Sequence, residues 1–496
     1  MRKFSIFCLG LVLFCLPAQA ETLNIGSKRF TESYILGEIL RQTAQAAGES
    51  QVSHKQGLGN TGIVYAALRN GSIDLYCEYT GTIDQEILKN TTPSNLESLK
   101  KQLAPLGLGV GIPVGFNDTY ALAMAESQAQ KLNIRKLSDL ARHPELRFGL
   151  SQEFLNRKDG WPGVKSVYNF RVDPRGLEHG LAYEAIATGQ IDVTDIYSTD
   201  AKINKYKLRV LDDDRHFFPA YEAVILYRLD LPNRLPKTWA ALQTLQGRVD
   251  AKAMIAMNAA AELQGQSFSE IAKAFLSNGT TQAESSSFVE KLFGQDFARL
   301  MLEHLFLVFV SLSFGIFVGI PLGVVAAYRG KLAQPILTIV GLIQTIPSLA
   351  LLAFLIPLLK QIGTLPALIA LFLYALLPIV RNTYTGLSDI PGSLRESALA
   401  LGLPFAARLR LVELPLAART ILAGVKTSAV INVGTATIAA FIGAGGFGER
   451  IATGLALNDN ATLLAGALPA AALALLVQWG FDLLDRWIVP AGLRLR

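Results

Sequence analysis

Five long apolar segments dominate the last 200 residues of this 496-residue chain. They are residues 301–328, 333–359, 362–380, 420–442 and 462–484. A helix needs about 20 predominantly apolar residues to cross a bilayer, and each segment approaches or exceeds that length. Charged residues make up 22 of the 200 residues from 297 to 496, against 62 of the 276 residues from 21 to 296. The chain therefore divides into a soluble half and a membrane half.

Basic residues between the apolar segments indicate their orientation. Ten of them follow the first, third and fifth segments, whereas the alternate loops hold only Lys360 and Arg450. Cytoplasmic loops carry an excess of Lys and Arg, so the pattern predicts five or six spans with the soluble half outside and the C-terminus in the cytoplasm. The net charge of +6 thus reports membrane topology, and it argues against nucleic acid as a partner.

The N-terminus has the pattern of a secretory signal. Arg2 and Lys3 precede an apolar run over 4–17, and Ala18-Gln19-Ala20 supplies small residues for cleavage. A retained membrane anchor is the alternative. Cys77 is the only cysteine after residue 20, so no intramolecular disulfide is expected. Together, this signal and the apolar segments predict a multi-pass protein of a bacterial inner membrane, with its soluble half exported to the periplasmic face.

The soluble half alternates between strand and helix patterns, which favours an α/β fold. Strands are expected over 23–26 and 147–151, and a helix over 31–46. An internal repeat also occurs, because the pattern Ala-aliphatic-x-x-Gly-x-Ile-Asp appears at 67–74 and again at 185–192. In each copy a helix ends at a glycine that suits a left-handed C-cap, and a strand follows. Two similar units predict two lobes with a cleft between them.

Four tyrosines fall where such a cleft would bind a ligand. Tyr79 and Tyr197 follow the two repeat copies at the same spacing, while Tyr120 comes just after an expected crossover and Tyr221 just before an expected strand. Ligands of open α/β sheets bind beyond the carboxyl ends of the strands. A single tyrosine beside a strand is more often part of the core, but four in such positions indicate an aromatic site.

The loop between the third and fourth apolar segments has a distinct pattern. It reads ESALALGLPFAARLRLVELP over 396–415, which predicts a short helix, a turn at Gly402 and a second amphipathic helix ending at Pro415. This arrangement resembles the cytoplasmic loop by which ABC importer permeases dock on their ATPase. The resemblance implies a coupling role for Glu396, Ala398, Gly402, Leu414 and Pro415, within a loop spanning 389–415. Any cytoplasmic helix–turn–helix with Glu, Ala and Gly is the alternative.

Several blocks of the soluble half resemble the periplasmic binding proteins for glycine betaine, choline and related osmoprotectants. The blocks lie at 23–40, 57–82, 116–124, 191–203 and 217–223. The resemblance implies a two-lobed type II periplasmic-binding-protein fold of α/β class, followed by an all-α permease domain of the type I ABC importer kind. It also implies that the four tyrosines box a quaternary ammonium group, which has no N–H for hydrogen bonding and is selected by aromatic faces. The carboxylate of a zwitterionic solute would contact Thr82, Thr61 or Ser33.

The resemblance further sets the expected boundaries and partners. The domains are a signal peptide over 1–20, a binding domain over 21–280, a linker over 281–298 and a permease over 299–496. The expected partners are a small solute, a separate ABC ATPase that uses ATP, a second copy of the permease in a homodimer, and membrane lipid. No phosphate-loop motif occurs and the five histidines have no zinc-ligand spacing, so neither a cofactor, a metal nor enzymatic activity of the chain itself is expected.

Three alternatives for function stay open at this point. The same architecture could import a sulfur-containing betaine such as ergothioneine, which also carries a trimethylammonium group. An amino acid is a further candidate, although its site would need an acidic residue and an arginine in place of an all-aromatic cage. A ligand-gated channel or sensor with the same binding fold predicts a pore filter and lacks the cytoplasmic loop.

Overall fold

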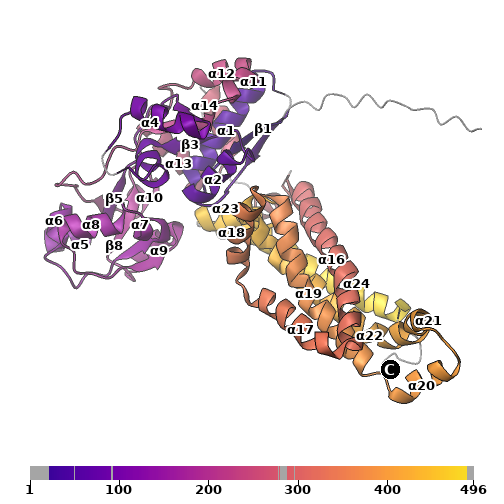
Figure 1. The fold of residues 1–496 in the computed structure, drawn as a ribbon. Helices are drawn as coiled ribbons and strands as arrows, with labels where there is room; N and C mark the ends of the chain where they lie inside the picture. The colour runs from indigo at the N-terminus through magenta and orange to yellow at the C-terminus, as the bar shows by residue number, and fades with distance from the viewer. Residues whose placement is uncertain are drawn as a thin grey trace, which may run out of the picture.

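A computed structural model describes residues 22–49, 51–90, 93–277, 279, 287–294, 296–457 and 459–488. The expected signal peptide and residues 281–286 and 295 of the expected linker lie outside these residues. A two-lobed α/β domain sits at one end of an elongated bundle of helices (Figure 1). The structure and the family matches below confirm the predicted fold class in both halves.

The first lobe is built on a five-stranded sheet with the order β2-β1-β3-β10-β4. The first three strands run parallel, while β10 runs antiparallel to both of its neighbours. Helices from both ends of the domain cover this sheet, and α1 packs against α12, α13 and α14. The elements are β1 (Leu23–Gly26), α1 (Thr31–Ala46), β2 (Val52–Lys55), α2 (Thr61–Arg69), β3 (Leu75–Tyr79), α3 (Thr80–Thr82), η1 (Ile83–Ile87), α4 (Leu96–Leu103), η2 (Ala104–Leu106), β4 (Leu108–Gly111), β10 (Ala223–Arg228), α11 (Leu231–Arg234), α12 (Pro236–Gln243), α13 (Ala251–Glu262) and α14 (Phe268–Leu276).

The second lobe is inserted between β4 and β10. Its three-stranded antiparallel sheet has the order β8-β5-β9, and β6 and β7 form a parallel pair beside it. The elements are β5 (Tyr120–Ala125), α5 (Glu126–Leu132), α6 (Leu137–Leu140), β6 (Gly149–Ser151), α7 (Gln152–Asn156), α8 (Trp161–Tyr168), β7 (Arg175–Leu177), α9 (His179–Ala187), β8 (Val193–Tyr197), α10 (Lys202–Lys205) and β9 (Leu208–Val210).

The internal repeat occupies equivalent places in the two lobes. Gly71 and Gly189 have positive φ angles of 79° and 67° directly after α2 and α9. The following aspartate then accepts a backbone N–H from a neighbouring segment, as Asp74 does from Asn24 and Asp192 from Arg147, each at 2.8 Å. Both units thus turn from a helix into a strand that ends at a tyrosine, which explains why the repeat marks the two sides of the cleft.

The second half of the chain is helical. Four segments of the described residues are long and apolar enough to cross a membrane, and a bent helix pair brings the number up to five, at the lower end of the expected range. These segments are Phe297–Tyr328 (α16), Thr364–Ser388 (α19), Phe405–Ile442 and Asn460–Asp485 (within α24, Asn460–Ile488). The bent pair is α17 (Gly330–Thr345) and α18 (Ser348–Leu359). Shorter helices are α15 (Phe288–Leu292), α20 (Gly392–Ala400) and α23 (Gly448–Leu457).

The second apolar segment does not run straight. Helices α17 and α18 meet at an angle of 99°. Pro347 disfavours the helical conformation for the residue before it, and Ile346 is extended, with φ −68° and ψ 125°. This bend places α18 at the end of the bundle that faces the two lobes (Figure 1).

The prediction that a helix ends at Pro415 is wrong. The chain continues from α21 (Phe405–Arg408) through a π-helical turn over Leu409–Glu413 (η3) into α22 (Leu414–Ala439) and η4 (Ala440–Ile442). Pro415 is the second residue of α22, where the wider π-helical turn precedes it and a missing N–H is tolerated. The fourth span is therefore longer than the expected 420–442.

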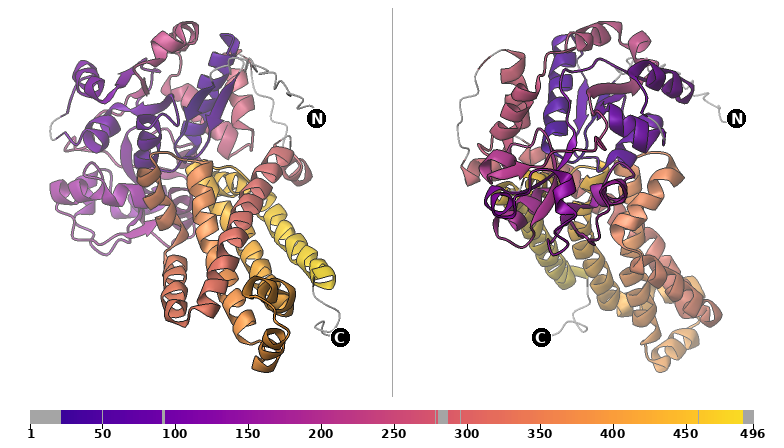
Figure 2. Two further views of the ribbon diagram at one scale, coloured as in Figure 1. Left: turned by 45° about the vertical axis from the view of Figure 1, so that its right-hand side comes forward. Right: turned by 90° about the vertical axis from the view of Figure 1, so that its left-hand side faces the viewer.

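The two halves share a hydrophobic core at their seam. One buried cluster contains Leu58 and Val64 of the first lobe together with Ile356 and Ile442 of the helical half. A Cβ atom added at Gly443, which has a φ of +75°, would lie 2.5 Å from Leu58. The views in Figure 2 agree that the helical ends lie directly beneath the lobes. The binding domain is thus packed on the bundle and not merely tethered to it.

Candidate functional site

The four tyrosines predicted from the sequence lie at strand ends beside the crossovers between lobes. Tyr79 ends β3, Tyr197 ends β8, Tyr120 begins β5 and Tyr221 precedes β10. Tyr120 is directly opposite Tyr197 in the β5–β8 ladder, and their ring centroids are 5.1 Å apart. The ring of Tyr221 meets that of Tyr120 edge-on at 5.5 Å. Three of the four tyrosines therefore form one aromatic cluster.

Phe30 links the fourth tyrosine to this cluster. Its ring stacks on Tyr197 with a centroid distance of 5.6 Å and lies 6.3 Å from the ring of Tyr79. Phe30 is the N-cap residue of α1, at the carboxyl end of β1, and its side chain lines both cavities described below. No role was predicted for Phe30 from the sequence, although an aromatic residue just beyond a strand end was a usable signal.

Two side-chain cations already occupy aromatic faces of the cluster. Lys28 Nζ lies 4.8 Å from the centre of the Tyr79 ring and forms a buried ion pair of 2.6 Å with Glu78. The guanidinium carbon of Arg157 lies 5.5 Å from the centre of the Tyr120 ring. Neither cation was singled out from the sequence. Their positions mean that the rings already accommodate positive charge.

Arg157 also ties the two lobes together. Its Nη2 lies 3.3 Å from Thr82 Oγ1 of the first lobe, and its Nε donates to Asp159 at 2.8 Å. Tyr221 Oη donates to the same aspartate at 2.6 Å. Although burial raises the pKa of the Asp159 carboxyl, Arg157 lowers it below its ordinary value, so the bridge stays charged. Contacts between Thr82, Tyr221 and this ion pair therefore hold the cleft closed.

Thr61 and Ser33, the other two predicted polar contacts, lie in different places relative to the cleft. Thr61 begins α2, and its hydroxyl lies 3.5 Å from Glu153 across the cleft. Ser33 is buried in α1, where its hydroxyl oxygen accepts the backbone N–H of Lys28 at 2.8 Å. Ser33 lines neither of the cavities described below, and it shapes the loop that presents Lys28.

Burial keeps the tyrosines of the cluster neutral. It raises the pKa values of Tyr79, Tyr120, Tyr197 and Tyr221. The phenols therefore act as donors, and Tyr79 Oη donates to the Glu32 carboxylate. A neutral ring keeps its negative face without carrying a formal charge, which is the property that cation–π recognition uses.

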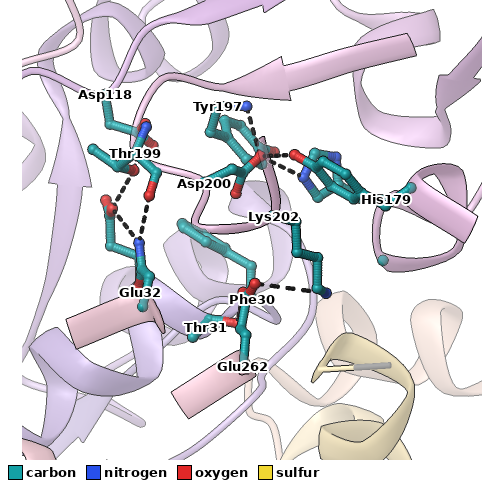
Figure 3. A pocket seen from close by; sticks show the side chains of 13 residues that line it. Phe30, Thr31, Glu32, Asp118, His179, Tyr197, Thr199, Asp200, Lys202 and Glu262 are labelled. Carbon is teal, nitrogen blue, oxygen red and sulfur yellow. Dashed lines mark hydrogen bonds and ion pairs between the residues drawn. The ribbon is translucent and has the colours of Figure 1, made fainter. Parts of the chain in front are cut away.

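A small pocket of about 20 Å³ lies between the lobes behind Phe30, surrounded by acidic groups (Figure 3). The Thr199 hydroxyl lies 2.6 Å from Glu32 and 2.8 Å from Asp118. Burial raises the pKa of Glu32 to about 7, against the opposing hydrogen bond from Thr199. Burial opposes the charge of His179, but the carboxylate of Asp200 raises its pKa to about 9. The pocket thus retains protons that these groups would lose in water.

Lys202 connects this pocket to the helical half of the chain. Its Nζ lies 3.6 Å from Glu262 of the first lobe and donates to the carbonyl oxygen of Leu457 at 3.3 Å. Leu457 ends α23, where carbonyl groups lack partners within the helix and a cation is favourable. Both lobes and the bundle therefore meet at one buried lysine.

A larger cavity of about 630 Å³ opens from the cleft onto the helices. Thr61, Arg157 and Tyr197 line it on the side of the lobes. Helix α18 and the turn after α22 line the opposite side. Its volume lies within the range of small-molecule sites. The aromatic cluster therefore communicates with the end of the helical bundle.

The predicted cytoplasmic helix pair is formed by α20 and the start of the fourth span. Gly402 turns between them with a φ of +73°, Glu396 is exposed and Ala398 is buried. Leu414 and Pro415 lie in the continuous helix. Buried Glu413 lies 3.1 Å from Arg408 and 3.6 Å from Arg395, and these contacts join the two helices. The pair leaves large apolar side chains exposed at Leu394, Leu399, Leu401, Phe405 and Leu411.

Comparisons with known families divide the chain into the same two halves, the two-lobed domain and the helical bundle. Residues 21–278 match the family described as the substrate binding domain of ABC-type glycine betaine transport systems. Residues 319–490 match the family described as the inner membrane component of binding-protein-dependent transport systems.

Individual relatives match one half or the other. Over 192 residues the chain is 45% identical to the choline transport system permease protein OpuBB of Bacillus subtilis, covering 39% of this chain and 88% of that protein. Over 296 residues it is 35% identical to a glycine-betaine-binding protein of Pseudomonas aeruginosa, covering 56% and 93%. Over 286 residues it is 33% identical to the ergothioneine transport permease/ergothioneine binding protein EgtU of Helicobacter pylori, covering 56% and 51%.

Proposed function

Because this chain belongs to the family of ABC-type glycine betaine binding domains and carries a fused importer permease, we propose that it captures and imports a quaternary-ammonium solute. Glycine betaine, choline and carnitine are the candidate solutes. The aromatic cluster of Tyr79, Tyr120, Tyr197, Tyr221 and Phe30 is the observation that carries this proposal.

The cluster suits a cation that cannot donate hydrogen bonds. A trimethylammonium group interacts with an aromatic face by roughly 0.5–2 kcal/mol, and the upper value applies where water is excluded. Lys28 and Arg157 lie over the rings of Tyr79 and Tyr120, so a bound solute would occupy ring faces that these two side chains now cover. Hydrated alkali cations would have to lose their water to enter, which favours the weakly hydrated ammonium.

Polar groups beside the cluster suit the other end of a zwitterion. Arg157 of the second lobe contacts Thr82 of the first lobe, and Thr61 of the first lobe lines the same large cavity as Arg157. A guanidinium group binds a carboxylate in two-pronged geometry. A carboxylate placed here would share Arg157 with Asp159, and it would join the lobes directly. Ser33 is a weaker candidate, because its hydroxyl already contacts the backbone of Lys28.

The permease half suits an ATPase partner at its far end. The exposed apolar side chains of α20 and the turn after it include Leu399 and Leu401, and exposed apolar patches mark docking surfaces. In this proposal a separate ATPase uses ATP and binds here, while the chain itself holds no cofactor. Exposed rings on the bundle, such as Phe317 and Trp479, suit lipid or a second permease copy in a homodimer. The inner membrane, with the lobes on the periplasmic face, is the corresponding location.

Ergothioneine is the second candidate solute. The relative from Helicobacter pylori matches over the same length of this chain as the glycine-betaine-binding protein does. A larger betaine would extend from the aromatic cluster into the cavity of about 630 Å³. A channel or sensor is not proposed, because the permease family match includes the cytoplasmic helix pair.

Calorimetry on the purified full-length chain tests the proposal. Glycine betaine, choline, carnitine and ergothioneine are titrated separately, with proline as a zwitterion that has no trimethylammonium group. We expect at least one trimethylammonium compound to bind below the millimolar range and proline to bind much more weakly. If none of the four binds in that range, the proposed function is wrong.

A further inference from the structure

The large cavity has two unlike walls. The lobes contribute mainly polar and charged side chains together with Phe30, Tyr197 and Ile63, whereas the permease contributes Leu349, Leu352, Ala353, Ile356, Phe441 and Ile442. Among these described permease residues, Phe441 is the one aromatic side chain. Aliphatic side chains cannot bind a quaternary ammonium group, but an aromatic face can. Phe441 is therefore the chemically distinct group on the permease side of the cavity.

Phe441 is held in place by a tightly packed turn. It lies in η4, where α22 ends, and Gly443 follows with a positive φ and packs on Leu58. The backbone N–H of Gly446 donates to Glu303 at 3.0 Å, which fixes the rest of the turn to α16. Ile442, the neighbour of Phe441, is buried in the core shared by both halves. The ring thus has a fixed position at the entrance to the bundle.

A cation of the binding domain covers this ring. The guanidinium carbon of Arg29 lies 4.1 Å from the centre of the Phe441 ring. Lys28 and Arg157 also lie over rings, but each of them has a carboxylate partner. No ion pair of Arg29 occurs among the described residues, and its buried Nε has no hydrogen-bond partner there. Burial lowers the pKa of Arg29, which shows that its charge is poorly solvated.

We propose that the face of Phe441 is a second, transient binding site for the quaternary-ammonium solute at the entrance of the permease, and that Arg29 occupies it until the solute arrives. This inference rests on the proposed function. Glu178 lines the same cavity and attracts the guanidinium group, so Arg29 has an alternative partner when it leaves the ring. A solute leaving the aromatic cluster would then exchange one aromatic face for another.

Uptake and binding must be measured separately to test this site. The full chain is reconstituted with its ATPase partner in proteoliposomes, and uptake of radiolabelled choline and glycine betaine is followed with time. Binding of the same compounds to the full chain is measured by calorimetry. The variants are Phe441→Leu, which keeps an apolar side chain without an aromatic face, Phe441→Trp, which keeps the face, and Arg29→Gln.

We expect Phe441→Leu to lower the maximal uptake rate at least tenfold while the dissociation constant changes less than twofold. Phe441→Trp should stay within threefold of the wild type, and Arg29→Gln should be at least as fast as the wild type. Three results overturn the inference: unchanged uptake in Phe441→Leu, loss of binding affinity in parallel with uptake, or equal losses in Arg29→Gln and Phe441→Leu. The last result would make the pair a structural clamp between the halves.

The wild-type protein separates the two levels of the proposal. If the wild type binds and imports neither these two compounds nor carnitine and ergothioneine, the proposed function itself fails and the second site fails with it. If the wild type imports one of them and the variants give an overturning result, only the second site is refuted.

Discussion

Tyr197 is the residue whose removal tests the aromatic cluster most directly. It contacts Tyr120 and Phe30 at centroid distances of 5.1 and 5.6 Å, and it also lines both cavities. Truncation to alanine removes one face available to the solute and leaves two other rings with less support. Its two ring neighbours come from different segments, so this substitution loosens the cluster on two sides.

The expected loss follows from these contacts. A desolvated aromatic face is worth up to roughly 2 kcal/mol for a cation. An aromatic pair adds about 0.5–1.5 kcal/mol that would be lost in part. A total of about 2 kcal/mol corresponds to an affinity decrease of about 30-fold, since 1.4 kcal/mol is a factor of ten. We therefore expect Tyr197→Ala to weaken binding by tenfold or more.

Calorimetry with choline on the full-length chain measures this loss. Tyr197→Phe keeps the ring and should bind within about threefold of the wild type, because the ring face carries the interaction. Tyr227→Ala is a matched control, because Tyr227 packs on Trp239 in the first lobe and lines neither cavity. An unchanged affinity in Tyr197→Ala, with the melting temperature preserved, would show that Tyr197 only packs in the core and would refute the reasoning.

Contacts at the lobe interface and the turn at Gly402 lead to three further predictions. Although burial opposes protonation of His179, Asp200 raises its pKa from 6.5 to about 9, so its stabilising contribution is complete below pH 6.5 and is lost as the pH rises to 9. The melting temperature should fall across this window, and a wild-type slope in His179→Gln would contradict the assignment. Lys202→Met leaves Glu262 buried without its cation, at a cost of roughly 3 kcal/mol. Limited proteolysis should therefore become faster, and the added change Glu262→Gln should restore resistance. Equal proteolysis rates in the single and double variants would argue against the ion pair. Gly402→Ala forces an alanine into a left-handed turn at a cost of roughly 1–2 kcal/mol. Solute uptake should therefore fall while solute binding stays unchanged, whereas Gly402→Asn should retain uptake. An equal loss of uptake in both variants would show that the backbone conformation of Gly402 is not the cause.

Much of the binding domain follows from local sequence signals. The strand at 23–26 and the helix at 31–46 have the bounds expected from their patterns. The positions of Tyr79 and Tyr197 also followed from a repeat in which a glycine ends a helix and a strand comes next. Such features depend on a few neighbouring residues, and these residues are enough to determine them.

Features that depend on distant contacts were missed. Lys28 and Phe30 lie two positions apart in the loop after β1, and their place in the cluster depends on how β1 and β8 approach one another. The helix runs through Pro415 because a π-helical turn precedes it, and no sequence signal for that turn was recognised. Arg29 and Phe441 lie in different halves of the chain, so their contact depends on how the two domains pack.

At the proposed site, the cations of the chain itself would make solute binding an exchange. Lys28 is held by Glu78 at 2.6 Å and Arg157 is paired with Asp159, so both can move from a ring while keeping an ionic partner. Arg29 has no such partner among the described residues, and it covers the ring that lies farther along the path. The affinity of each aromatic face is therefore the difference between two cations, and not the full cation–π energy. At the tyrosines, the net affinity is therefore smaller than the number of rings suggests. The ion pairs that Lys28 and Arg157 retain stabilise these side chains once they are displaced. At Phe441 it depends on whether Glu178 receives the guanidinium group. A solute would therefore pass from the tyrosines to Phe441 without a deep energy well only where Glu178 receives the guanidinium group.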